Sequence, residues 1–126
     1  MHALDNIHAA LAPGGILVDT QPVSAHAPVA ADGDCLGTLD MREWLDTIEA
    51  VDELIAQTLR AGLYELQHES RFVVTDTYDD GRECLEIVGG WRGTLVPDDV
   101  STRLATTTTS VTVQQDVRLR LLRREP

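Results

Sequence analysis

The feature that most constrains the fold is a short apolar run, Ile16-Leu17-Val18, which directly follows Pro13-Gly14-Gly15. Proline cannot continue a helix and paired glycines permit a sharp reversal, so we expect the chain to turn before the run begins. A continuous apolar run predicts a strand that is buried on both faces, because a strand with one wet face alternates apolar and polar residues. Strands of this kind are normally central in a sheet. We therefore expect Ile16 to Val18 to occupy an interior position.

The segments on either side of this run have simple signals. The opening residues predict a short helix, because apolar side chains recur at spacings of three and four: Leu4, Ile7 and Leu11. Residues 21 to 31 are rich in alanine, proline and serine, which favours extended or looped backbone. Asp32-Gly33-Asp34 predicts a turn that joins residues 28–31 to residues 35–39 in a small hairpin.

The clearest predicted element is a long amphipathic helix between Asp40 and Gly62. Asp40 and Glu43 have the spacing of a capping box, and Gly62 suits the left-handed residue that ends a helix. Its apolar stripe comprises Met41, Trp44, Leu45, Ile48, Val51, Leu54, Ile55 and Leu59.

The second half of the chain predicts a strand, a short helix and a final strand. Residues 63–78 are strand-like, and Asp80 with Glu83 predicts a cap for a short helix that buries Cys84. Residues 94–109 are expected to be irregular or weakly helical. The last strand alternates strictly, so we expect one wet face and one buried face that carries Val111, Val113, Val117, Leu119 and Leu121.

Length and charge limit the class of protein. The 126 residues suit a single domain, which we take to span residues 1–126. Twenty-one acidic residues against ten arginines, with no lysine, give a net charge of −11. Such a surface repels nucleic acid and anionic lipid, so we expect neither as a partner. Cys35 and Cys84 are too few for a disulfide framework, and we expect two reduced thiols in or near the core of a cytoplasmic protein.

No catalytic or metal-binding motif stands out. The glycine-rich phosphate loops, the G-x-S-x-G elbow and the H-E-x-x-H pair are missing from the sequence. The histidines are far apart in sequence, which favours solvated or singly hydrogen-bonded side chains over a metal site: His2, His8, His26 and His68. We therefore assign no catalytic, cofactor-binding or metal-binding residue.

Three residues nevertheless deserve a second interpretation. Asp19 follows the apolar run, where ligands gather in open α/β sheets, although we favour a structural role for its carboxylate over a catalytic one. Trp44 and Trp91 could stack on a ligand, although both fall on apolar helical stripes and core packing is favoured.

Nearly the whole chain is similar to a known family. The opening helix, the Leu11-x-Pro13-Gly14-Gly15 turn and the run that ends at Asp19 resemble the helix, turn and fifth strand of class I S-adenosylmethionine-dependent methyltransferases. The later order of long helix, strand, short helix and final strand also resembles the C-terminal portion of that family. The resemblance implies an α/β fold, α+β-like when alone, with a mixed sheet of about three to five strands and packed helices. It also implies that the last strand lies between the family's fifth and sixth strands.

The same resemblance bears on activity. In that family the glycine-rich cofactor turn and the acidic residue that binds the ribose belong to the N-terminal half, and neither has a counterpart in this sequence. We therefore expect no bound cofactor, and methyl transfer by this chain alone is not expected, because positioning donor against acceptor is most of what such an enzyme contributes.

These observations leave three functional hypotheses, in order of preference. The first is a non-catalytic methyltransferase-like module that acts through self-association or as a partner subunit. The second is a chain that completes an active methyltransferase in trans. The third is a small enzyme or ligand carrier with a pocket around Asp19, the proline-rich loop and Trp44. For the first, we expect a homodimer or a partner protein to pair with the edge at Ile16, Leu17 and Val18, because an unpaired apolar strand invites another chain.

Overall fold

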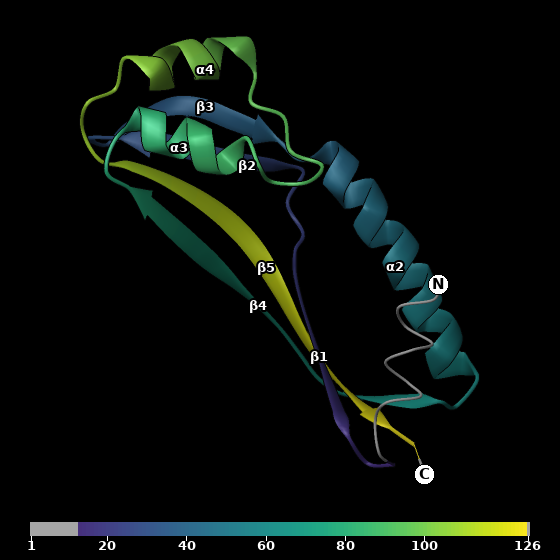
Figure 1. The fold of residues 1–126 in the computed structure, drawn as a ribbon. Helices are drawn as coiled ribbons and strands as arrows, with labels where there is room; N and C mark the ends of the chain where they lie inside the picture. The colour runs from purple at the N-terminus through teal and green to yellow at the C-terminus, as the bar shows by residue number, and fades with distance from the viewer. Residues whose placement is uncertain (1–12, 126) are drawn as a thin grey trace.

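The computed structural model of the protein describes residues 13–125, which form a five-stranded sheet with three helices (Figure 1). The expected helix over residues 4–11 lies outside the described residues. In chain order the elements are β1 (Ile16–Pro22), β2 (His26–Ala31), β3 (Asp34–Asp40), α2 (Arg42–Arg60), β4 (Tyr64–Tyr78), α3 (Gly81–Val88), α4 (Asp98–Ala105) and β5 (Val111–Arg124).

The last strand, β5, is the centre of the sheet. β4 pairs with one edge of β5 from Tyr64 to Tyr78, while β1 and then β2 share its other edge, and β3 pairs with β2. All of these pairings are antiparallel, so the α/β class and the strand number are confirmed but the expectation of a mixed sheet is wrong. The strand order β1-β5-β4 places β5 between β1 and β4, which is the order that the resemblance implied for the last strand.

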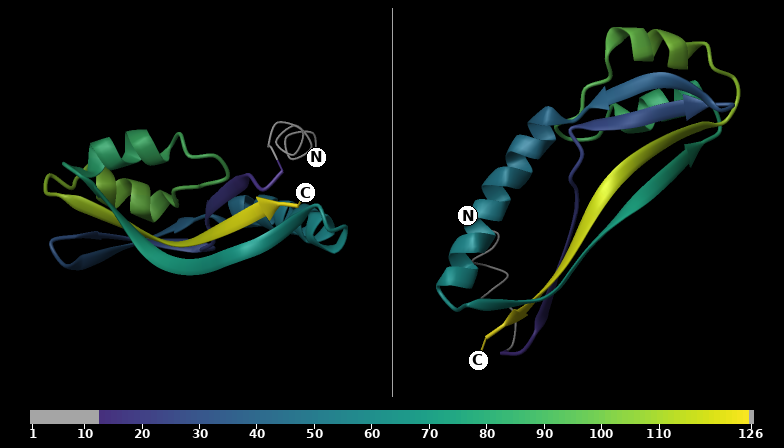
Figure 2. Two further views of the ribbon diagram at one scale, coloured as in Figure 1. Left: turned by 90° about the horizontal axis from the view of Figure 1, so that it is seen from below. Right: turned by 180° about the vertical axis from the view of Figure 1, so that it is seen from behind.

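The helices cover opposite faces of the sheet at its two ends (Figure 2). At the first half of β5, α3 and α4 pack on the face that carries Val111 and Val113, and both valines are fully buried. At the second half of β5, α2 packs on the other face around Leu122. The alternation of β5 is confirmed, but the expected faces are wrong in this half: α2 buries the even-numbered side chains, arginines included, while Leu119 and Leu121 are only partly buried.

The prediction that Ile16 to Val18 is buried on both faces is wrong. Ile16 is 48% exposed and Val18 is 57% exposed, and the strand continues beyond the apolar run to Pro22. The physical reason is that α2 covers the face of β1 that carries Leu17, while no described helix covers the other face. Among residues 13–125, β5 is the one strand that pairs with β1, so β1 is an edge strand and not an interior one.

Most turn and cap signals are confirmed. Asp32 and Gly33 both have positive φ, the geometry of a two-residue hairpin turn, and they connect β2 to β3. Gly62 has φ +73° just after α2, as expected for a helix end. The Asp80 side chain accepts a hydrogen bond from the Glu83 amide at 2.9 Å and caps α3.

Two details of the helices differ from expectation. Asp40 does not cap α2: Met41 is the N-cap residue, and the Asp40 carboxylate accepts bonds from the Arg42 amide and guanidinium. The stretch expected to be irregular or weakly helical contains α4, with Val100 and Leu104 buried against the core. No helix within residues 13–125 is long and apolar enough to cross a membrane.

Candidate functional site

A buried cluster of two arginines and two aspartates lies between α2 and the sheet. Arg118 and Arg120 on β5 point toward α2, and their side chains are 8% and 10% exposed. Arg120 donates two hydrogen bonds to Asp19 on β1, at 3.0 and 2.7 Å, and one to Asp52 on α2 at 2.9 Å. Arg118 donates two more to Asp52, at 3.0 and 2.7 Å. The four groups are therefore neutral as a set and connect three elements.

The electrostatics of this cluster favour its charged form. Burial, the largest single influence on Asp52, raises its pKa, but the hydrogen bonds and positive charges of Arg118 and Arg120 outweigh burial and lower the pKa overall. The Asp52 bonds raise the pKa of Arg118 against the opposing effect of burial. Asp19 is 8% exposed and holds an arginine in place, which agrees with the structural role favoured above. Within residues 13–125, Asp19 does not line the hollow that Trp44 lines.

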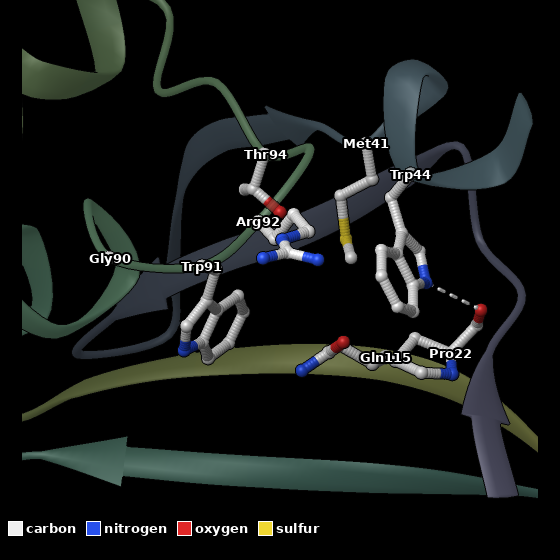
Figure 3. Close-up of a pocket in the computed structure, with 8 residues that line it drawn as sticks. All are labelled: Pro22, Met41, Trp44, Gly90, Trp91, Arg92, Thr94 and Gln115. Atoms are coloured by element: carbon white, nitrogen blue, oxygen red, sulfur yellow. Dashed lines mark hydrogen bonds between the residues drawn. The ribbon is translucent and has the colours of Figure 1, made fainter. Parts of the chain in front are cut away.

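A separate hollow of about 410 Å³ lies where the end of β1, the start of α2 and the loop after α3 meet the middle of β5 (Figure 3). Both tryptophans of the chain contribute to it. Figure 3 shows the two indole rings on opposite sides of the hollow, with the Arg92 guanidinium and the Gln115 carboxamide between them. The lining residues are Pro22, Met41, Trp44, Gly90, Trp91, Arg92, Thr94 and Gln115.

Backbone contacts hold the walls of this hollow together. The Trp44 amide donates to the Gly93 carbonyl at 3.2 Å, and the Trp44 indole donates to the Pro22 carbonyl at 3.1 Å. Asp40 and Leu95 exchange two backbone hydrogen bonds of 2.9 and 2.8 Å. Gly93 has φ +71°, and a Cβ there would lie 2.8 Å from the Trp44 backbone, so this approach requires glycine.

The two tryptophans thus have two roles at once. Each packs against the core on one side, as the favoured interpretation predicted, and each lines the hollow on the other. The proline-rich loop contributes Pro22, whereas Asp19 belongs to the ion cluster beneath α2. Of the pocket expected around Asp19, the proline-rich loop and Trp44, the hollow therefore contains Pro22 and Trp44 but not Asp19.

The other candidate residues do not come together. Cys84 is buried, as expected, and burial followed by the charge of Glu83 raises the pKa of its thiol to about 11. Cys35 is exposed on β3, so its expected place in or near the core is wrong. His26 begins β2 and His68 lies on β4, while His2 and His8 lie outside the described residues. In residues 13–125, no three His, Cys, Asp or Glu side chains form a potential metal site.

An apolar surface lies on the uncovered face of the second half of the sheet. Opposite residues of an antiparallel pair point to the same face, and the register places Val18 opposite Leu121 and Phe72 opposite Val117. We call this surface the open face, and it comprises Ile16, Val18, Phe72, Leu119 and Leu121. Phe72 is 43% exposed, Leu119 and Leu121 are partly exposed, and no described helix covers them.

Sequence reasoning missed the arginine cluster and half of the hollow. The two arginines alternate with leucines in an apolar strand, which was the available signal, but their aspartate partners are 66 and 101 residues away. Arg92, Thr94 and Gln115 carried no signal at all, because they come from the loop after α3 and from β5, which are far apart in sequence.

Comparisons with known proteins add no family to these observations. No protein-family model, no characterised protein and no solved structure matches the chain.

Proposed function

We propose that the chain is a non-catalytic, methyltransferase-like module that acts by association through the open face and the adjoining edge of β1. A second copy of the chain is the first candidate partner, and a separate partner subunit is the other. The observation that carries the proposal is the open face itself, where Ile16, Val18 and Phe72 are each more than 40% exposed on one continuous sheet surface. Contiguous apolar surface of this kind marks interaction sites on proteins.

The edge of β1 adds to this surface backbone groups that can pair with another strand. Within the described part of the chain, β1 pairs with β5 on one side and with no strand on the other. Its unpaired backbone groups can accept a strand from another polypeptide, which is a common mode of recognition. The edge carries no charged side chain on the open face, since Ile16, Val18 and Thr20 are the successive β1 residues that point to it. It therefore lacks the charges that usually protect an edge from pairing.

The oligomeric state with two matched variants tests this proposal. Val18 on the open face and Val73 on β4 are 57% and 59% exposed, and the register places Val73 on the opposite face. Sedimentation at micromolar concentration should show a dimer for the parent chain and for Val73→Asp, and a monomer for Val18→Asp. Circular dichroism controls for folding. A monomeric parent chain excludes self-association and leaves the partner subunit, and a dimer in Val18→Asp excludes the open face.

The strand order favours a second candidate function, in which the chain completes an S-adenosylmethionine-dependent methyltransferase in trans. The central place of β5 between β1 and β4 supports this candidate, because it agrees with the order that the resemblance implies. A partner that carries the glycine-rich cofactor turn would then pair with β1. Calorimetry with S-adenosylmethionine separates the two functions: binding only after mixing with such a partner supports the second, and no binding in the mixture supports the first.

A further inference from the structure

We propose that the hollow between Trp44 and Trp91 binds a small planar aromatic molecule that carries a carboxylate. The site is distinct from the open face, because none of the residues that line it belongs to that surface. The aromatic ring would occupy the space between the two indoles, and the carboxylate would face Arg92.

The walls of the hollow select a flat apolar group. Two indole rings, the Met41 thioether and Pro22 line it with apolar atoms, and both indoles remain only partly buried by the protein. Indoles pack well against aromatic rings in offset or edge-to-face geometry, and thioether sulfur contacts rings favourably. A volume of about 410 Å³ falls within the range of pockets that hold small molecules.

The polar groups of the hollow select a negative charge. Arg92 is the one charged residue among its lining residues, and within residues 13–125 it forms no ion pair. No carboxylate lines the hollow, which disfavours a cationic ligand despite the aromatic walls. The Thr94 hydroxyl is buried without a hydrogen-bond partner, so it has donor and acceptor capacity to offer a bound group. An arginine fork beside a hydroxyl suits a carboxylate.

The site is largely preformed, which lowers the entropy cost of binding. The Trp44–Gly93 backbone bond and the Trp44–Pro22 indole bond fix one wall. Gln115 on the opposite side is 8% exposed, and its amide donates to Asp76 at 3.4 Å. Side chains held in this way lose little freedom when a ligand binds.

Nuclear magnetic resonance provides a direct test, because the chain has two tryptophans and both line the site. Each indole N–H gives one signal in a ¹⁵N-labelled sample. Titration with 2-naphthoate should shift both indole signals and saturate. The neutral isostere 2-naphthamide should bind about fivefold more weakly, which is the effect of one exposed charge pair. Cyclohexanecarboxylate, which lacks the aromatic ring, should bind more weakly than 2-naphthoate.

Two arginine variants complete the test. Arg92→Gln should abolish the difference between 2-naphthoate and 2-naphthamide, while Arg82→Gln, an exposed arginine on α3 away from the hollow, should preserve it. Both arginines are exposed, so neither change should alter the backbone spectrum. The proposal is overturned if 2-naphthoate leaves the indole signals unmoved, if the acid and the amide bind equally to the parent chain, or if Arg92→Gln leaves their difference intact.

Discussion

Replacing Asp19 with asparagine should destabilise the fold by about 3 kcal/mol, because it breaks a buried ion pair while leaving its partner in place. The Asp19 carboxylate accepts both of the short bonds that tie Arg120 to β1, and it lies 4.0 Å from Arg118. Asparagine has nearly the same shape, so the change removes a charge and leaves packing intact. Arg120 would then share the carboxylate of Asp52 with Arg118, whose Nε also lies 4.0 Å from Glu69.

The magnitude follows from burial. The Arg120 and Asp19 side chains are 10% and 9% exposed, so water and salt screen their interaction weakly. Removing one partner of a buried pair typically costs 3–5 kcal/mol, and we take the lower end because Asp52 still accepts one bond from Arg120. A domain of this size is stable by roughly 5–15 kcal/mol, so the loss is a large share of the total.

Urea unfolding followed by circular dichroism measures this loss. With a denaturant slope of about 2 kcal/mol per molar, the midpoint should fall by about 1.5 M. Asp46→Asn is the matched control, because Asp46 is exposed on α2 and forms no ion pair in the described part of the chain. Its midpoint should stay within about 0.25 M of the parent, which corresponds to the roughly 0.5 kcal/mol of an ordinary surface change. Equal midpoints for the two variants would refute the assigned role of Asp19.

A paired substitution separates the energy of the pair from the cost of one unpartnered charge. Asp19→Leu with Arg120→Met removes both members and fills the space with apolar atoms. Because such replacements are often neutral or stabilising, the double variant should recover most of the stability that Asp19→Asn loses. A double variant less stable than Asp19→Asn would mean that the Asp19–Arg120 pair itself contributes net stability.

Three further predictions concern other parts of the fold. Gly93→Ala should destabilise the fold by at least about 2 kcal/mol, because position 93 has a positive φ and a Cβ there would lie 2.8 Å from the α2 backbone. Gly33→Ala is the control, because Gly33 has a similar φ but open space around it, and it should cost about 1 kcal/mol. Urea unfolding measures both. Of the two thiols, Cys35 should react with a disulfide reagent at neutral pH at the rate of an exposed cysteine, and Cys84, buried with a pKa of about 11, should react only on unfolding. Folding lowers the pKa of Asp52, so the Asp52 carboxylate stabilises the fold at pH values above its unfolded pKa near 4. This stabilisation is lost as the pH falls through the pKa of Asp52 in the folded protein. Asp52→Asn should therefore reduce the fall in unfolding free energy that acid causes.

Local signals were sufficient to predict most of the elements. The Asp32-Gly33 turn, the Gly62 helix end and the Asp80 cap all depend on residues within a few positions of each other, and the structure confirms each of them. The strict alternation of β5 was equally clear, because strand geometry places every second side chain on one face. Each of these signals depends on interactions within a single turn or a single strand, so residues close together in sequence are enough to reveal it.

Which face of a strand is buried could not be predicted, because that depends on distant helices. The apolar run at Ile16 indicated burial on both faces, but among residues 13–125 a helix covers one face of β1, the face beneath α2. Arg118 and Arg120 looked like a solvated face for the same reason: nothing near them in sequence shows that Asp52 lies above them. The hollow beside Trp44 depends on four segments and had no local signal beyond the tryptophans.

The apolar stripe of β5 is longer than the core that covers it. Its odd-numbered side chains begin at Val111 beneath α3 and α4, and the stripe continues through Val117 to Leu119 and Leu121, where no described helix covers them. The first half of the sheet needs the apolar residues Val111 and Val113 to fold, because they belong to its core. The second half already has a core on the even-numbered face around Leu122, so the leucines on the odd-numbered face add nothing to that core. Polar residues at these two positions would keep strand geometry and improve solubility, so the proposed association gives a reason for their apolar character that the core of residues 13–125 does not.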